Sequence, residues 1–351
     1  MRLQRLHIKN FKSIVDLEIV EPNPFTVFVG PNGSGKSNIF EALELVHMIG
    51  NISEYEIENI LGGKESYLNV NSSNDKVNLS FEYEGKNYTY IFPEVQITTT
   101  ISPLFTPNPS LTPTPVSVDA KIPEQSLPKF EVPNTYSPSF AKWIVLNFKN
   151  LRSSVPNVSN KKANYKSAEK LDSLASNLEK VLKRILQEKN KREEILELLE
   201  LLIPELENIQ IYSDTVSGQD TLLIKEKYTS KHFGKSLISD GTYNILCLLT
   251  ALYQSDEPQF LCIEEPENGL NPYAIELIVE LMRNKCQEKG HYIWLNTHSP
   301  NLVRHLRADE LIVVDKKQGA TQIKQFKGKD YFGLRMDEAW LTNALGGGLP
   351  W

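Results

Sequence analysis

The stretch "FTVFVGPNGSGKSNIFEALELVHMIG", residues 25–50, decides the fold of this chain. It opens with an almost continuous apolar run, as in a strand that is buried on both faces. Residues 30–37 then match the pattern G-x-x-x-x-G-K-[ST], and apolar residues recur after them at helical spacing until a glycine. A strand, a glycine-rich loop and a helix in this order predict an α/β fold with a phosphate site where the loop meets the helix.

The loop residues have a chemical reason to contact a nucleotide. Glycines let backbone N–H groups approach phosphate oxygens, and the helix N-terminus adds a favourable field for an anion. We expect Lys36 to reach the β- and γ-phosphates and Ser37 to bind Mg²⁺. The alternative, a glycine-rich turn that matches by chance, is disfavoured by the strand and helix that flank it. The nucleotide-binding set expected here is Gly30, Pro31, Asn32, Gly33, Ser34, Gly35, Lys36, Ser37 and Asn38.

Two adjacent carboxylates end a second apolar run, "LCIEEPENGLNP", residues 261–272. Walker-type NTPases hold Mg²⁺ with a carboxylate at the end of a strand beside the phosphate loop, and Glu264 is placed for that role. A second carboxylate can orient and deprotonate the attacking water, so Glu265 is the candidate general base. In isolation the pair could equally be a turn cap and a solvated side chain. The phosphate loop in the same chain favours the catalytic interpretation.

Strands and helices alternate around these motifs. Residues 3–20 predict two half-exposed strands, residues 77–95 a hairpin that turns at 84–86, and residues 168–202 two helices or one bent helix. Alternation of strands and helices predicts a largely parallel core sheet. We therefore expect a P-loop α/β fold with a parallel core sheet, an antiparallel β-region and a helical lobe.

Composition shifts divide the chain into segments. Half of its 20 prolines lie between residues 93 and 138, which excludes a helix there and predicts an extended surface insertion. The expected segments are an N-terminal lobe with the phosphate loop and hairpin (1–92), the proline-rich insertion (93–140), a helical region and strand (141–230), a lobe with the remaining motifs (231–315) and a tail (316–351).

Charge and cysteine content restrict the environment. A net charge of −6 gives no general attraction to nucleic acid. Residues 161–192 hold an excess of Lys and Arg that could bind DNA phosphates, but acidic residues follow directly, so a solvated helical pair is the alternative. Three cysteines without a C-x-x-C pair indicate a reducing compartment, and no apolar run approaches the roughly 20 residues of a membrane span. We expect a cytoplasmic protein that does not cross a membrane.

Four ordered segments, "GPNGSGKSN", "ISDGTYNIL", "LCIEEPENGLNP" and "NTHSP", together resemble the ATP-binding heads of the RecF/SMC branch of ABC-type ATPases. They are most similar to compact prokaryotic AAA-type ATPases with an "EEPENGLHP" motif, and the opening "LHIKNFKSI" is similar to the first strand of the family. The likeness covers about residues 1–50 and 168–315. It implies Mg²⁺-dependent ATP hydrolysis in a homodimer, or a higher oligomer, that encloses ATP between subunits.

The resemblance also implies roles for single residues. His298 matches the switch histidine that contacts the γ-phosphate, so the expected catalytic set is Glu265, His298 and Lys36. Lys12 and Ser13 match a position that touches the nucleotide. The signature segment, which in this family faces the γ-phosphate of the opposing subunit, and the loop that crosses the dimer interface correspond to Ser239, Asp240, Gly241, Thr242, Asn268 and Asn271. Without the motif order, Ser239 would be an ordinary helix cap and His298 a structural residue.

Two departures from the family pattern bear on function. Glu264 stands where the family usually has an aspartate, and Asp240 stands where transporters have a glycine, which argues against a transporter subunit. No glutamine can be assigned as the Mg²⁺ sensor, since Gln96 follows a strand but lies beside the proline-rich segment.

Two functions are consistent with these motifs. One is a switch ATPase that controls a separate effector, such as a nuclease, in bacterial defence or DNA maintenance, because residues 316–351 are too few for a nuclease domain. The other is a RecF-like, ATP-gated DNA clamp in DNA repair. The tail residues Trp340, Leu341, Leu345 and Trp351 predict either a docking surface for a partner or packing against the chain's own sheet.

Overall fold

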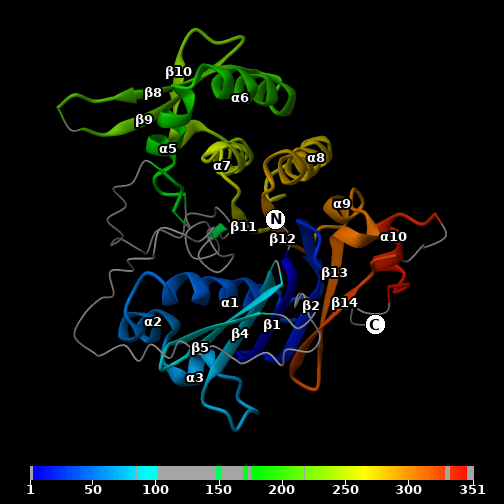
Figure 1. The fold of residues 1–351 in the computed structure, drawn as a ribbon. Coiled ribbons are helices and arrows are strands. Elements are labelled where there is room, and N and C mark those ends of the chain that lie inside the picture. The colour runs from blue at the N-terminus through cyan, green and yellow to red at the C-terminus, as the bar shows by residue number, and fades with distance from the viewer. Residues whose placement is uncertain are drawn as a thin grey trace.

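The computed structural model describes residues 3–83, 85–101, 148–151, 169–172, 175–216, 218–328 and 333–345. Figure 1 shows a central sheet, with an antiparallel sheet and α1 to α3 at one end of the molecule and a helical lobe with a small sheet at the other. The helices are α1 (Lys36–Ile49), α2 (Glu54–Leu61), α3 (Lys64–Tyr67), α5 (Leu178–Leu186), α6 (Lys189–Leu202), α7 (Asp240–Tyr253), α8 (Pro272–Lys289), α9 (Pro300–Val303) and α10 (Met336–Leu341), with 3₁₀ turns η2 (Lys235–Leu237) and η3 (Ala308–Glu310).

The central sheet carries the motifs. Its strand order is β14 (Ala320–Gln325), β13 (Leu311–Lys317), β3 (Phe25–Val29), β12 (Tyr292–Thr297), β11 (Phe260–Glu264) and β7 (Phe148–Leu151). All neighbours are parallel except β13 and β14, which form an antiparallel hairpin. The predicted, largely parallel core sheet is confirmed, although neither β7 nor β14 was expected from the sequence.

Two smaller sheets complete the β-structure. The antiparallel sheet has the order β2 (Ile14–Val20), β1 (Leu3–Phe11), β4 (Val77–Tyr83), β5 (Lys86–Phe92) and β6 (Gln96–Ile101), which confirms the first two strands and the hairpin. Strand β6 uses the first residues of the proline-rich segment; residues 102–147 lie outside the described chain. The third sheet has the order β10 (His232–Gly234), β9 (Asp220–Glu226) and β8 (Leu206–Ser213), and β8 was not predicted.

The central sheet separates two hydrophobic cores. In β3, Phe25, Val27 and Val29 belong to the core that packs on α5 to α8, whereas Phe28 belongs to the core that packs on α1 and the antiparallel sheet. The same alternation continues through β11 and β12. Both faces are therefore covered, which is why these strands read as apolar runs.

Aromatic rings join the central sheet to α1 and the N-terminal strands. The ring of Trp294 lies 4.9 Å from that of Phe260 and 5.3 Å from that of Phe28, and Phe28 contacts Phe40 of α1 edge-on. The hydroxyl of Tyr292 accepts a hydrogen bond of 2.7 Å from the backbone N–H of Leu3. Large aromatic rings bury the most apolar surface area per residue, so this cluster stabilises the sheet that carries the site.

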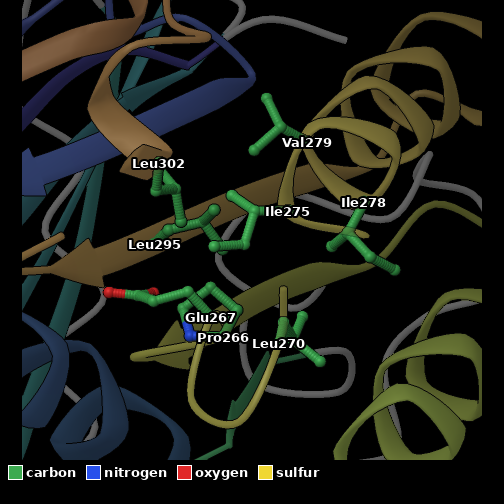
Figure 2. A pocket seen from close by; sticks show the side chains of 8 residues that line it. All are labelled: Pro266, Glu267, Leu270, Ile275, Ile278, Val279, Leu295 and Leu302. Atoms are coloured by element: carbon green, nitrogen blue, oxygen red, sulfur yellow. The ribbon is translucent and has the colours of Figure 1, made fainter. Parts of the chain in front are cut away.

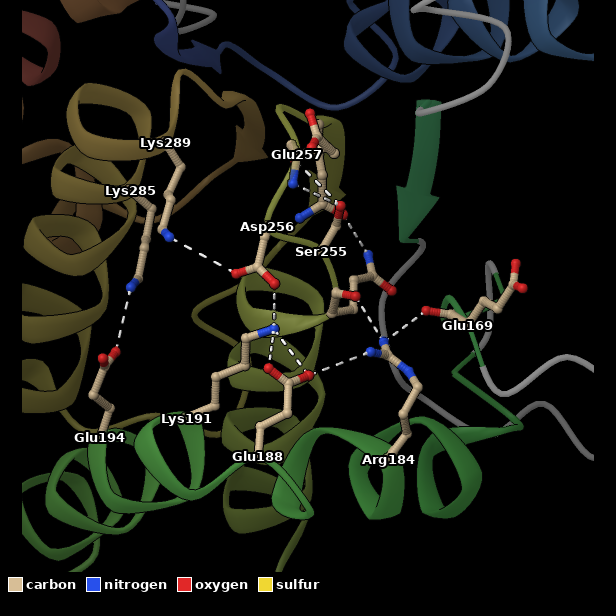
Figure 3. Close-up of polar contacts among 12 residues, drawn as sticks. Glu169, Arg184, Glu188, Lys191, Glu194, Ser255, Asp256, Glu257, Lys285 and Lys289 are labelled. Carbon is tan, nitrogen blue, oxygen red and sulfur yellow. Dashed lines mark hydrogen bonds and ion pairs between the residues drawn. The ribbon is translucent and has the colours of Figure 1, made fainter.

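The helical lobe is tied to α7 and α8 by ion pairs, shown in Figure 3. Lys191 of α6 lies 2.7 Å from Asp256, which follows α7, and Lys285 of α8 lies 3.7 Å from Glu194. Arg184 donates to the backbone oxygens of Glu169 and Gln254. Of the two arrangements that the sequence allowed for residues 168–202, the structure shows two helices, α5 and α6.

The three cysteines are buried and free. Trp340 and Leu345 belong to the hydrophobic core, so they pack internally, while Leu341 is 43% exposed and Trp351 lies outside the described residues. No helix in the described ranges has the length and apolar character that a membrane crossing requires.

Replacement of Trp294 by alanine should lower the free energy of unfolding by about 3–5 kcal/mol, because the cavity it leaves cannot be filled by its rigid neighbours. Urea denaturation measures this loss. The control is Tyr228→Ala, whose side chain is 87% exposed and should change stability by less than about 0.5 kcal/mol. A Trp294 variant as stable as this control would contradict the role of the aromatic cluster.

Candidate nucleotide site

A cleft of about 360 Å³ opens at the carboxyl ends of the parallel strands, where open α/β sheets place their ligands. It is lined by residues of the phosphate loop, the two adjacent glutamates and the ends of β12 and β13. The lining residues are Ser13, Asn32, Gly33, Gly35, Lys36, Ser37, Asn38, Glu264, Glu265, Asn296, His298 and Lys316. The structure thus brings the predicted loop, metal and catalytic residues together.

The phosphate loop packs so closely against neighbouring strands that Gly30 and Gly35 leave no space for a side chain. A Cβ atom at Gly30 would lie 2.0 Å from the carbonyl oxygen of Val314, and one at Gly35 would lie 2.0 Å from Oγ1 of Thr321. Gly33 and Gly35 also have φ of 75° and 101°, the left-handed region that favours glycine. The loop conformation therefore depends on β13 and β14, two strands far away in sequence.

Lys36 is buried at the start of α1. Its ammonium donates to the carbonyl oxygens of Gly30 at 2.7 Å and Pro31 at 3.0 Å. Burial lowers the pKa of Lys36 to about 8, and Glu265 and Glu264 oppose this shift. The ammonium is thus already held inside the loop where phosphate oxygens are expected.

The donor set around Ser37 fits Mg²⁺. Glu264 of β11 pairs in register with Asn296 of β12, and the Asn296 amide donates to Oγ of Ser37 at 3.3 Å. The buried Oδ1 of Asn296 has no hydrogen-bond partner among the described residues. A carboxylate, a hydroxyl and an amide oxygen suit a hard cation that keeps water and phosphate ligands. Asn296, in the "NTHSP" segment, was missed from the sequence.

No group of three or more His, Cys, Asp or Glu side chains that could hold a metal ion occurs in the described ranges.

Glu265 lies beyond the end of β11 in a left-handed backbone conformation, with φ of 49°. Such a conformation costs energy for a residue with a side chain and is common at active sites. The backbone N–H of Glu265 donates to the carbonyl oxygen of Asn296 at 2.7 Å. Its carboxylate lies 3.2 Å from Nε2 of His298, so the two predicted catalytic residues are in direct contact.

His298 connects this pair to the phosphate loop. Its Nδ1 lies 3.1 Å from the carbonyl oxygen of Gly30 and 3.4 Å from the ammonium of Lys36. Burial lowers the pKa of His298, and the charge of Lys36 lowers it further, while Glu265 opposes both effects. The ring is therefore poised beside both the loop and the candidate base.

The signature segment and the interface loop form a second unit, outside the cleft. Ser239 caps α7 by accepting from the N–H of Thr242 at 3.2 Å. Gly241 and Gly269 touch so closely that a Cβ at Gly241 would lie 2.2 Å from the carbonyl oxygen of Gly269. Asn244 of α7 donates to the carbonyl oxygens of Pro266 at 2.8 Å and Asn268 at 3.0 Å.

The interface loop continues into α8. Asn271 caps this helix by accepting from the N–H of Ala274. None of the signature or interface-loop residues lines the cleft of the same chain.

Of the two residues after the first strand that were predicted to touch the nucleotide, Ser13 lines the cleft and Lys12 does not. Ser13 lines the cleft, and its hydroxyl accepts from the Asn38 amide at 2.6 Å. Lys12 is not among the lining residues; its ammonium pairs with Glu41, and its backbone N–H donates to the carbonyl oxygen of Tyr67.

Gln96 lies in β6 of the antiparallel sheet, is exposed and does not line the cleft. Strand β7, in contrast, runs parallel to β11 with Leu151 beside Ile263, so the chain leaves β7 near the cleft. Residues 152–168, which follow, lie outside the described chain.

Glu267 anchors the interface loop and was missed from the sequence. Figure 2 shows it among apolar side chains that include Leu270, Ile275 and Leu302. One carboxylate oxygen accepts from the Thr297 hydroxyl, which in turn accepts from the backbone N–H of Ser299 at 2.9 Å. Glu267 therefore connects the loop after Glu265 to the segment that carries His298.

Comparison with known proteins identifies relatives of this arrangement. A family model described as "AAA domain, putative AbiEii toxin, Type IV TA system" matches residues 25–304. The chromosome partition protein Smc of Methanocaldococcus jannaschii is 52% identical over 44 residues, 12% of this chain and 4% of that protein. The DNA replication and repair protein RecF of Acaryochloris marina is 46% identical over 46 residues, 13% of this chain and 12% of that protein. The alignments thus span small parts of these relatives.

Two solved structures share the fold over most of the chain. A structure of the Smc head bound to the C-winged helix domain of ScpA has a TM-score of 0.56 at 14% identity and covers 96% of this chain and 99% of that chain. The SMC head domain from Thermotoga maritima has a TM-score of 0.51 at 17% identity and covers 93% of this chain and 99% of that chain. The predicted fold, a RecF/SMC-like ABC-type ATPase head, is confirmed.

Glu267 provides a pH test of this site. Burial raises the pKa of Glu267 from its ordinary value of 4.5 to about 7. The stability that the protonated group contributes is complete below about pH 4.5 and is lost as the pH rises through about 7, because the unfolded chain releases the proton first. Glu267→Gln keeps an acceptor for Thr297 but cannot ionise.

The unfolding free energy of this variant, relative to the unmodified protein, should therefore increase between pH 5 and pH 8. Urea denaturation at both pH values measures it. A difference that does not change with pH would show that Glu267 is not held in a protonated, buried state.

Proposed function

The chain belongs to this AAA-domain family, and from that premise we propose that it is a Mg²⁺-dependent ATPase whose subunits close in pairs around ATP and thereby control a separate effector. The observation that carries the proposal is the convergence of Lys36, Glu264, Glu265 and His298 on one cleft. The signature segment lies outside that cleft, as a half-site completed by a second copy requires.

Each cleft residue has a chemical task in this proposal. Ser37, Glu264 and Asn296 would hold Mg²⁺, which when bound neutralises charge on the β- and γ-phosphates. Lys36 would bind the same phosphates inside the loop. Glu265 would accept a proton from the attacking water, and His298, 3.2 Å from its carboxylate, would orient the carboxylate and contact the γ-phosphate.

Dimer closure would connect hydrolysis to an output. A closed dimer that forms only with ATP is a two-state switch, because the contacts of Ser239 with the opposing γ-phosphate exist in one state alone. The family description, "AAA domain, putative AbiEii toxin, Type IV TA system", supports a role in bacterial defence. The similarity to Smc and RecF supports DNA maintenance as the related context.

The DNA-clamp alternative gains less support from the structure. It relied on the excess of Lys and Arg in residues 161–192, of which Lys161, Lys162 and Lys166 lie outside the described chain. Among the described residues, Lys183 pairs with Asp220, and Lys191 pairs with Glu188 and Asp256. Arg184 is occupied by backbone oxygens, as Figure 3 shows. Cations already paired within the chain release fewer counterions on binding DNA. We therefore favour the effector-controlling switch.

The first test removes the candidate base. Glu265→Gln keeps the shape of the side chain but cannot accept the proton, so the rate of phosphate release should fall by about 10²- to 10⁴-fold while ATP stays bound. Phosphate release and filter binding of ATP measure the two effects. The matched control is Glu276→Gln on the exposed face of α8, which should hydrolyse ATP normally. Normal turnover by the Glu265 variant would refute the assignment of the base.

The second test addresses the composite site. In the Glu265→Gln background with Mg²⁺ and ATP, Ser239→Ala should reduce the dimer fraction seen by sedimentation velocity, because the opposing γ-phosphate loses a donor. Ser53→Ala is the matched control, since Ser53 also caps a helix by accepting from a backbone N–H. Both variants lose about 1 kcal/mol of capping energy, so equal dimer fractions would argue against a signature role for Ser239.

A further inference from the structure

The hairpin β13–β14 forms a wall of the nucleotide cleft that no sequence motif indicated. Lys316, near the end of β13, is one of the residues that line the cleft. The wall is firmly attached to the phosphate loop: the Thr321 hydroxyl donates to the carbonyl oxygen of Ser34 at 2.9 Å, and its backbone N–H donates to the carbonyl oxygen of Ser13 at 2.8 Å. The position of β13 relative to a bound nucleotide is therefore well defined.

Strand register decides which lysine of this hairpin faces the nucleotide. Lys316 lies directly opposite Thr321 and Lys317 opposite Ala320. Residues that are directly opposite in an antiparallel pair share a face of the sheet, and successive residues alternate faces. Lys316 therefore shares the face on which Thr321 contacts the phosphate loop, while Lys317 points to the other face.

The charge of Lys316 is available to a ligand. The side chain is exposed, and its ammonium makes no hydrogen bond or ion pair with the described residues. Lys36 differs in this respect, since loop carbonyls already hold its ammonium. An exposed, unpaired ammonium on the wall of a phosphate site is suited to an anionic ligand.

The strand order indicates which phosphate of ATP Lys316 would contact. Glu265 and His298 follow β11 and β12, on one side of β3, and the γ-phosphate is expected there. Lys316 lies on β13, on the opposite side of β3. We propose that Lys316 is a nucleotide-binding residue that contacts the α-phosphate and so binds ATP and ADP equally well; the proposal rests on the ATPase function above.

Calorimetric titration with ADP and with AMP-PNP, both with Mg²⁺, tests this assignment. Lys316→Ala should weaken the binding of both nucleotides by the same factor, about tenfold, which corresponds to about 1.4 kcal/mol. Lys316→Arg should retain most of the affinity because it keeps the charge. Lys317→Ala is the matched control, since this neighbouring lysine is also exposed but lies on the other face. The nucleotide affinity of this variant should equal that of the unmodified protein.

The outcomes separate this inference from the proposed function. Unchanged affinity in Lys316→Ala, a loss confined to AMP-PNP, or an equal loss in Lys317→Ala would each overturn the assignment of Lys316. Failure of the unmodified protein to bind either nucleotide would overturn both proposals. Binding with the predicted lysine effect but without hydrolysis of ATP would support Lys316 and overturn only the ATPase function.

Discussion

Parallel pairing of β12 between β3 and β11 is the constraint on which the site depends. It places Thr297 beside Val29, the last residue before the phosphate loop. It also places Asn296 beside Glu264, the candidate metal ligand and the last residue of β11. A slip of one residue would move every side chain of a strand to the other face. Because both faces of this sheet are buried in separate hydrophobic cores, such a slip would disrupt the side-chain packing of both cores and would remove Asn296 from its place beside Glu264.

The loop after β11 joins the two halves of the proposed mechanism. It begins at Glu265 in the cleft and is held to the signature helix by the amide of Asn244. Through Glu267 it is also bonded to Thr297, next to the switch histidine. A movement of α7 on the proposed dimer closure would therefore reach the candidate base through these hydrogen bonds.

The positions that local motifs predicted agree with the structure where the contacting groups lie close together in the sequence. Lys36 lies inside its loop, and Ser239 caps its helix. The site residues that were not predicted from the sequence have one cause in common. Asn296, Glu267 and Thr321 act through residues distant in sequence, and an Asn, Glu or Thr carries no pattern that distinguishes a buried partner of a site from any polar residue.

The amino-acid sequence was sufficient to predict the P-loop α/β class, the order of the motifs and the residues that line the cleft except Asn296 and Lys316. These follow from local rules, since glycine spacing, strand hydrophobicity and helix caps operate over a few residues. Only the tertiary structure decided which strands lie side by side and which lysine of β13 faces the phosphate loop. It also decided which polar side chains support that loop. Long-range pairing is set by the cooperative burial of two cores, and no single segment of the chain contains that information.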